Sequence, residues 1–314
     1  MQRLPRQFRC LSIWSSTFCW STTCSPPLAG GEHEFTNHQT SFAAFCTATT
    51  RTSTALVQSH EKLQHSLVWY YCGLDKPPSR DTIDRFLTDL EHVIDDVFDR
   101  LVEQAAARGL LDSTYSIDST HIEAIQHNDA ASWNYDSTAE EYYYGFGCTL
   151  VSTGPKIPIA AEFTQAKQAD QETVMRVTCD ALAVDTPIWM LGDSAYDLLD
   201  WHDHLLAAGA VPIAPYNPRN TDDPLDIEYR VEDRIEEHSE DVQLKQSILD
   251  ETYNHRTGVE RTNDAVKDCA LGHVRARGRV HARTEVFLAL CLRVVVAITN
   301  FERGDDPGRE KLKL

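Results

Sequence analysis

A short apolar run at residues 187–191 constrains the fold more than any other stretch of the sequence. It is too short for a helix, and it ends at Gly192 and Asp193. A continuous apolar run of this length is typical of a strand buried on both faces, as in a parallel sheet covered by helices. We therefore expect Asp193 to lie at the carboxyl end of a buried strand.

The segments around this run alternate between the period of a strand and the period of a helix. Their order is β-β-β-α-β-α-β, which predicts an α/β protein with a mixed sheet and helices packed on it. The first strand contains Asp118, which interrupts a run rich in β-branched residues. The strands are expected at 114–122, 142–152, 156–165, 187–193 and 211–216, and the helices at about 170–183 and 198–208.

The chain before this sheet divides into two parts. Residues 1–55 hold only two of the chain's 48 acidic residues, Glu32 and Glu34, and we expect a disordered extension or translation of a non-native frame. Residues 56–110 predict a small helical module, with one helix running from Ser79 to near Gly109. Plain packing helices are favoured over a helix-turn-helix, because no basic recognition face is visible.

The main domain is expected at residues 111–302. A polar, acid-rich stretch at 218–247 reads as an insertion at the edge of the sheet. The apolar segment 284–300 predicts a buried helix rather than a membrane span, because Arg293 interrupts it. Residues 303–314 read as a polar tail.

The formal net charge of −19 at first argues against a nucleic-acid binder, because such proteins are usually basic. A cytoplasm rich in salt explains the charge better, because salt screens the repulsion between surface acids. The nine cysteines show no spacing typical of a zinc site, and we interpret them as reduced, buried thiols. These features predict a halophilic, cytoplasmic protein with no membrane span.

A polar stripe marks the late segment 253–267. Tyr253, Arg256, Glu260 and Lys267 have offsets of 0, 3, 7 and 14, which fall within an arc of about 60° on a helix. The alternative reading is a solvated face with an ion pair between Arg256 and Glu260.

Three carboxylates stand out by context: Asp118, Asp193 and Glu260. If they converge, their mutual repulsion requires cations, and oxygen ligands suit Mg²⁺ or Mn²⁺. Asp193 could instead be a cap that ends its strand, and Gly192–Ser194 is a weak match to a serine-esterase motif. His121 and Glu123 fall on the strand face opposite to Asp118.

Asp118, Asp193 and the spacing Tyr253-x2-Arg256-x3-Glu260-x6-Lys267 resemble the DDE transposases of insertion sequences. That spacing matches the Y-R-E-K signature of one group, and the acidic composition is similar to that of haloarchaeal versions. The resemblance covers roughly residues 56–300 and implies an RNase H-like fold. It implies that Asp118, Asp193 and Glu260 bind two Mg²⁺ or Mn²⁺ ions and are the catalytic residues for DNA cleavage and strand transfer.

The resemblance also implies a homo-oligomer that works on double-stranded DNA, at the inverted repeats of the element and at its target, in the nucleoid. Contacts to DNA are expected from Tyr253, Arg256 and Lys267 and from a basic cluster of Arg275, Arg277 and Arg279. Residues 142–144, three tyrosines, have at most a secondary role in this contact. The alternatives are an inactive, decayed DNA-binding remnant and an RNase H-like nuclease without strand transfer.

Overall fold

The structure is a computed structural model of the 314-residue chain. The predicted N-terminal extension and the predicted acidic insertion lie outside the described residues. The described residues are 75–125, 127–136, 140–154, 156–167, 173–215, 217, 252–256, 261–263, 266, 273–274 and 276–309.

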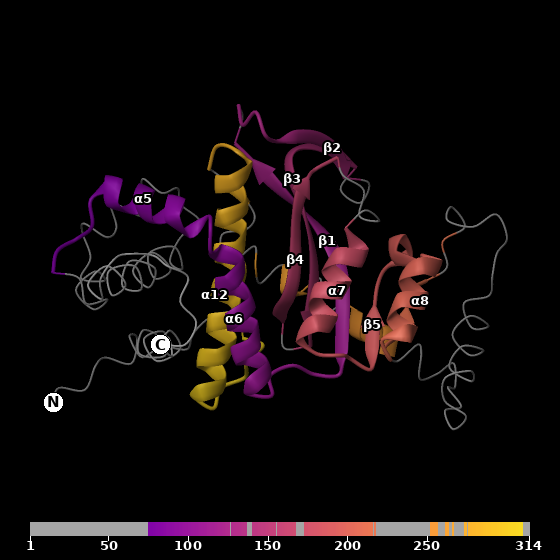
Figure 1. Ribbon diagram of the computed structural model, residues 1–314. Helices are drawn as coiled ribbons and strands as arrows, with labels where there is room; N and C mark the ends of the chain where they lie inside the picture. The colour runs from indigo at the N-terminus through magenta and orange to yellow at the C-terminus, as the bar shows by residue number, and fades with distance from the viewer. Residues whose placement is uncertain are drawn as a thin grey trace, which may run out of the picture.

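A seven-stranded mixed sheet organises the described part of the chain (Figure 1). Strand β3 pairs antiparallel with β1 on one edge and with β2 and β4 on the other, and β5, β6 and β7 extend the far side of β1 in parallel. This arrangement confirms the predicted RNase H-like mixed sheet. The strands are β1 (Thr114–Ala124), β2 (Ser132–Asp136), β3 (Glu141–Thr153), β4 (Ile157–Gln165), β5 (Trp189–Leu191), β6 (Val211–Ile213) and β7 (His273–Val274).

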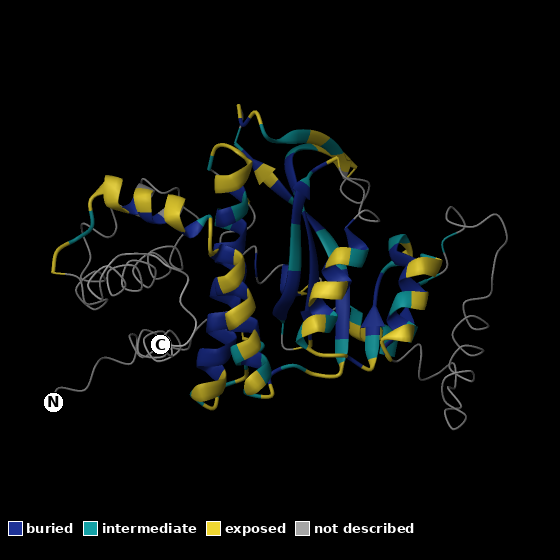
Figure 2. Cartoon of the chain, viewed as in Figure 1, coloured by how far each residue is buried: buried dark blue, intermediate teal, exposed yellow. Residues whose placement is uncertain are grey.

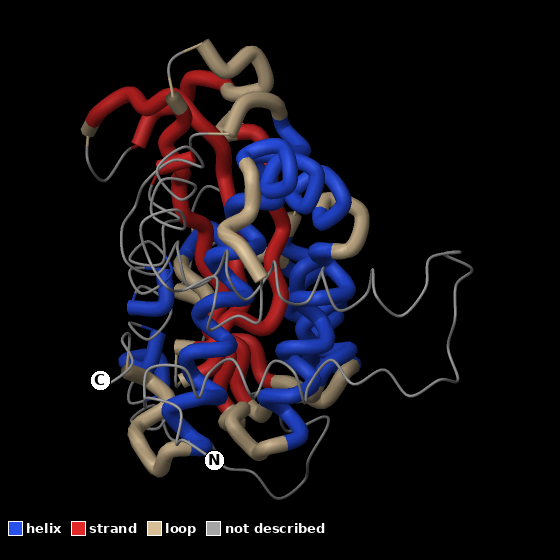
Figure 3. The backbone as a smooth tube through the Cα atoms, turned by 90° about the vertical axis from the view of Figure 1, so that its left-hand side faces the viewer, coloured by secondary structure: helices blue, strands red, loops and turns tan. Residues whose placement is uncertain are grey.

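Helices cover the sheet on both sides (Figure 3). Helix α7 (Val174–Val184) packs on β3 and β4, and α8 (Leu199–Ala207) packs on β6. Most buried side chains of the strands and of these helices form one main core, and Leu191 and Ile213 form a second, small cluster. Figure 2 shows buried residues along the strands and on the helices around them. The indole of Trp201, fully buried on α8, donates to Thr178 Oγ1 on α7 at 2.9 Å and so joins the two helices.

The predicted helix from Ser79 to Gly109 is two helices, α5 (Arg80–Leu90) and α6 (Ile94–Ala107). A turn at residues 91–93 separates them, and Val93 at its end is exposed. Helix α6 belongs to the main core, where the ring of Phe98 meets that of Phe287 edge-on, 5.7 Å between centroids. It is therefore a packing helix.

Helix α12 (Arg279–Glu302) begins five residues earlier than predicted and is the central helix of the core. It is long and apolar enough to cross a membrane, but 89% of its most apolar window is buried inside the protein, as for a core helix. Arg293, the charged residue that interrupts this apolar run, is fully buried. Its guanidinium donates to the carbonyl of Pro307 at 2.8 Å, so residues near the C-terminus pack back on the helix.

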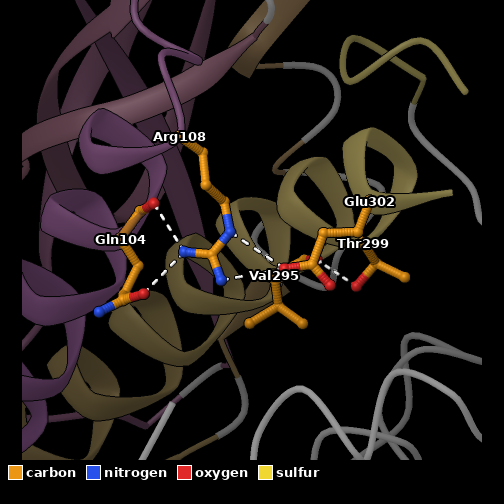
Figure 4. Close-up of polar contacts among 5 residues, drawn as sticks. All are labelled: Gln104, Arg108, Val295, Thr299 and Glu302. Carbon is orange, nitrogen blue, oxygen red and sulfur yellow. Dashed lines mark hydrogen bonds and ion pairs between the residues drawn. The ribbon is translucent and has the colours of Figure 1, made fainter. Parts of the chain in front are cut away.

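The C-terminal ends of α6 and α12 are joined by one guanidinium (Figure 4). Arg108 donates through Nε to Glu302 Oε1 at 3.0 Å and through NH1 to the carbonyl of Gln104 at 2.9 Å. Both charged side chains are partly exposed, so the contact fixes geometry more than it adds stability.

The three cysteines within the described residues are free thiols. Cys148 and Cys291 are buried as predicted, and burial, with a smaller contribution from Glu162, raises the pKa of the Cys148 thiol to about 12. Cys179 departs from the prediction because it is exposed on α7, with its Sγ 3.3 Å from His204 Nε2.

A cluster of acidic residues on α6 and α7 allows a test of the prediction that salt screens the repulsion between surface acids. Burial, with smaller contributions from Asp95, Asp180 and other acids nearby, raises the pKa of Asp99. A carboxyl whose pKa is raised by folding destabilises the protein when it is ionised, and this cost disappears as pH falls through that pKa. We expect Asp99→Asn to raise the free energy of unfolding at neutral pH by less than about 1 kcal/mol, because the group is partly exposed.

The gain should shrink toward 1 M KCl, where the screening length is about 3 Å, and should vanish at acid pH. Chemical denaturation over a series of KCl concentrations measures it. Asp305→Asn is the matched control, because Asp305 pairs with Arg309 at 3.4 Å and its loss should not stabilise the protein. A gain for Asp99→Asn that is independent of salt would show that burial alone, and not repulsion from the neighbouring acids, makes the ionised carboxylate costly.

Candidate active site

Asp118 lies in the middle of β1, where β3 pairs with the strand on one edge; on the other edge, β5 pairs with β1 only as far as Ser116 and β7 only from Glu123. It shares a face of the sheet with Ser116 and Thr120, because alternate residues of a strand point the same way. Its side chain is half-buried, whereas those of Tyr115, Ser116 and Ile117 before it are buried. A carboxylate is therefore presented where the pairing of β1 with β5 has ended and its pairing with β7 has not yet begun.

Asp193 lies two residues beyond the end of the neighbouring strand β5. Parallel pairing of β1 with β5 places Ser116 opposite Leu191, and Asp118 and Asp193 each follow two residues later. The backbone at Asp193 is still extended, with φ −79° and ψ −176°. Adjacent strands lie about 4.8 Å apart, so the register brings the two carboxylates to the same face and the same height.

The chain turns sharply after Asp193, which begins the short 3-10 helix Ser194–Tyr196. Gly192 makes the turn possible, because a Cβ there would come within 2.8 Å of the Tyr196 side chain. The Tyr196 hydroxyl lies 3.0 Å from Ser119 Oγ on β1 and so ties the turn to the central strand.

The capping alternative for Asp193 is partly correct. Its Oδ1 accepts a hydrogen bond from the backbone N–H of Ala195 at 2.8 Å. A carboxylate has two oxygens and about four lone pairs, so this bond leaves capacity for a cation. This hydrogen bond fixes the orientation of the Asp193 side chain and leaves part of the carboxylate available to bind a cation.

Tyr253 and Arg256 lie on the same face of the sheet as the two aspartates. Tyr253 packs against Leu191 and Ile213, and Leu191 shares the face of Asp193. The turn Asn254–Arg256 is a 3-10 helix rather than the predicted α-helix. Tyr253 immediately precedes this turn, and the Arg256 guanidinium lies 5.9 Å from the centroid of the Tyr253 ring.

Asn263 contacts Asp118 directly, a partner that the sequence did not predict. Its Nδ2 donates to Asp118 Oδ2 at 2.9 Å, and its side chain is almost completely buried. Its Oδ1 has no hydrogen-bond partner among the described residues. The sequence feature that could have indicated this contact is the position of Asn263 three residues after Glu260, which is about one helical turn away on the same side of a helix.

Three of the predicted site residues, Glu260, Lys267 and Arg275, lie outside the described residues. Within the described part of the chain, no group of three or more His, Cys, Asp or Glu side chains forms a metal site. Asp118 and Asp193 are thus the two predicted metal ligands that the structure describes.

Comparison with known proteins identifies the family of this arrangement. The sequence model of the family described as Transposase DDE domain matches residues 110–295, more than half of the chain. The chain belongs to the DDE transposase family. The match spans all seven strands of the sheet and most of α12, and so includes both described aspartates.

Two relatives of this transposase come from strains R1 and NRC-1 of Halobacterium salinarum. Each is a probable transposase for insertion sequence element ISH11 and is 74% identical over 247 residues, which cover 79% of this chain and 75% of the relative. These relatives confirm the resemblance to haloarchaeal insertion-sequence transposases.

Solved transposase structures are also similar. The synaptic complex of piggyBac transposase with hairpin DNA gives a TM-score of 0.46 at 10% identity, covering 96% of this chain and 73% of that one. The pre-cleavage Mos1 transpososome gives 0.23 at 8% identity, covering 70% and 78%.

The basic cluster of the transposase lies where β7 leads into α12. Arg277 and Arg279 are exposed on either side of Gly278, whose φ of 82° allows the sharp entry into the helix. Arg279 is the first residue of α12 rather than part of a loop. Because β7 pairs with Glu123 and Ala124, this cluster lies at the carboxyl end of β1.

His121 and Glu123 have separate contacts on the opposite face of β1, as their parity predicts. The His121 ring stacks at 4.8 Å on Tyr143, and Glu123 Oε2 lies 3.2 Å from His273 Nδ1. Neither residue joins the two aspartates.

Proposed function

We propose that this transposase cleaves DNA at the ends of its insertion sequence and joins the freed ends to target DNA, with Asp118, Asp193 and Glu260 as catalytic residues. The register that makes Asp118 level with Asp193 is the main support. The bond from Asn263 to Asp118 adds to it, because Asn263 follows Glu260 by only three residues.

The donor set fits Mg²⁺ or Mn²⁺, because carboxylate oxygens are the ligands these ions prefer. Asp118, Asp193 and Glu260 would hold two ions between them. The buried Oδ1 of Asn263, which has no partner among the described residues, also suits a site that is completed by a cation or its water. Bound divalent ions would stabilise charge on the transferred phosphate and activate the attacking hydroxyl.

The reaction consists of two phosphodiester exchanges. Water adds to the phosphorus at the element's end as the P–O3′ bond breaks, which leaves a 3′-hydroxyl. That hydroxyl then attacks a target phosphodiester, and a new P–O3′ bond forms as the target's own breaks. Asp118 and Asp193 act by position and charge, so no covalent bond to the protein is needed.

The cations near the aspartates would hold the DNA backbone. Arg256 is oriented by its contact with Tyr253 and would grip a phosphate as a planar fork, with Lys267 as a point charge. Arg275, Arg277 and Arg279 would follow the backbone of the duplex farther from the cut. These contacts fit a homo-oligomer that holds both ends of the element in a salt-rich cytoplasm, at the nucleoid.

A strand-transfer assay tests this proposal. The purified protein is incubated in high KCl with Mn²⁺, labelled DNA of the element's ends and a target plasmid, and the products are resolved on a denaturing gel. Cleavage together with joined products supports the proposal. Cleavage without joining would indicate a nuclease, and binding without cleavage would indicate a decayed remnant; either result overturns it.

A further inference from the structure

Four aromatic side chains form a ladder on one face of the β2–β3 ribbon. Trp133 pairs across the strands with Tyr144, and Tyr135 pairs with Tyr142. The ring centroids are 5.2 Å and 5.0 Å apart. Because Trp133 and Tyr135 are two residues apart, both pairs lie on the same face, which we call the aromatic ladder.

The aromatic ladder is far more exposed than contacts within the ribbon require. Tyr142 is 73% exposed, Trp133 65% and Tyr135 48%. Cross-strand aromatic pairs stabilise a ribbon by only about 0.2–1 kcal/mol each, and smaller or polar side chains would avoid leaving this much apolar surface in water. The open ring faces are therefore available to a flat partner.

A buried asparagine joins the aromatic ladder to the basic cluster. The Tyr144 hydroxyl donates to the carbonyl of Asn128 at 2.7 Å. The side chain of Asn128 in turn donates to the carbonyl of Ala276 at 3.0 Å and accepts from the N–H of Gly278 at 3.1 Å. The exposed Arg277 and Arg279 flank Gly278, so this hydrogen-bonded link has the cations at one end and the paired rings at the other, and we take the two together as one surface.

This surface lies beyond the carboxyl end of β1, at the top of Figure 1, where β2 and the start of α12 are found. Glu123, the last β1 residue paired with β3, lies opposite Gly145, next to the aromatic ladder. At about 3.4 Å per residue, Glu123 is about 17 Å along the strand from Asp118. DNA held at the two aspartates can therefore reach the aromatic ladder.

We propose that the aromatic ladder binds unpaired bases of the DNA strand next to the cleavage site, while the Arg277–Arg279 segment holds the phosphates of that strand. This proposal rests on the proposed transposase function. Aromatic rings with neighbouring arginines are the chemistry that recognises single-stranded nucleic acid. Unpaired bases are required because the faces of paired bases are covered by their stacked neighbours.

Charged residues at the two ends of the ribbon indicate how the bound DNA strand runs along the aromatic ladder. Glu140 and Glu141 are exposed at the far end of the ribbon, beyond the Tyr135–Tyr142 pair, and would repel phosphates there. The Trp133–Tyr144 pair lies nearest the cations. We therefore expect Trp133 to contribute more to binding than Tyr135.

The test compares binding of a blunt duplex with binding of the same duplex carrying a short single-stranded flank of mixed sequence. Fluorescence anisotropy without divalent metal measures both affinities. Wild type should prefer the flanked DNA. Trp133→Ala should weaken binding of flanked DNA by about tenfold and leave blunt-duplex binding unchanged, because stacking contributes about 1–3 kcal/mol per base. Trp133→Phe should keep most of the preference, since it retains a ring.

Phe301→Ala is the matched control, because Phe301 is an exposed aromatic residue at the opposite end of α12. A preference that survives Trp133→Ala would overturn the proposal. So would a change in sedimentation mass for Trp133→Ala without a change in DNA binding, which would indicate that a second copy of the chain covers the ladder. If the protein joins DNA strands but does not prefer flanked DNA, the role of the aromatic ladder is refuted and the proposed function stands. If it prefers flanked DNA but does not cleave, the proposed function is refuted and the ladder's binding of unpaired bases stands.

Discussion

Asp118→Asn and Asp193→Asn should each reduce strand cleavage by more than about 1000-fold, equivalent to about 4 kcal/mol of transition-state stabilisation. Each change removes one negative charge from the pair that the parallel register makes level. The amide is nearly the same size as the carboxylate, so the sheet should be preserved. Gel assays of cleavage with Mn²⁺, together with DNA affinity measured without metal, separate chemistry from binding.

Both variants should bind end DNA as tightly as wild type or more tightly, because each removes a negative charge that faces phosphates. Asp203→Asn is the matched control, since Asp203 is exposed on α8 and undergoes the same chemical change. If either active-site variant cleaved at the wild-type rate, the assignment of that aspartate would be wrong.

Asn263→Ala should lower cleavage by about 10–100-fold at limiting Mn²⁺, the usual cost of losing a group that orients a metal ligand. The amide of Asn263 donates to Asp118 Oδ2, so its loss frees the carboxylate to rotate away from its working position. The concentration of Mn²⁺ that gives half-maximal cleavage should rise, and excess Mn²⁺ should restore much of the rate.

A role in folding alone would not produce that metal dependence. Thermal unfolding without metal gives the structural effect of Asn263→Ala, and Asn263→His tests whether another donor restores the rate at low Mn²⁺. If Asn263→Ala lowered the rate by the same factor at every Mn²⁺ concentration, Asn263 would not position Asp118 for metal binding.

The sequence was sufficient to predict five of the sheet's seven strands and the places of two carboxylates along the chain, because apolar runs mark buried strands whatever surrounds them. Asp193 was identified from the run that precedes it, and Asp118 from its interruption of a β-rich segment. The position of Asp193 along the sheet relative to Asp118 could not be predicted, because the register depends on which strands pair. The contact of Asn263 with Asp118 depends on tertiary packing in the same way.

Three features were missed: strand β2, the two-residue strand β7, and the break between α5 and α6. Strand β2 escaped prediction because its aromatic residues, Trp133 and Tyr135, point to solvent, whereas the patterns used assume that apolar side chains are buried. The break between α5 and α6 was missed because apolar residues continue through it: Leu90 and Ile94 on either side are both buried. Hydrophobic periodicity indicates which side chains are buried, but it does not show where one helix ends and the next begins in a different direction.

The two aspartates differ in how firmly their backbones are held. Asp118 lies inside an 11-residue strand that pairs with β3 at that position, whereas Asp193 lies two residues beyond the three-residue strand β5 and is anchored through Gly192 and the Tyr196 hydroxyl. Any adjustment of the gap between the carboxylates should therefore come from the Asp193 side. Natural variation that tunes this enzyme to ions of different radius should accumulate at Gly192–Tyr196, while the middle of β1 stays fixed.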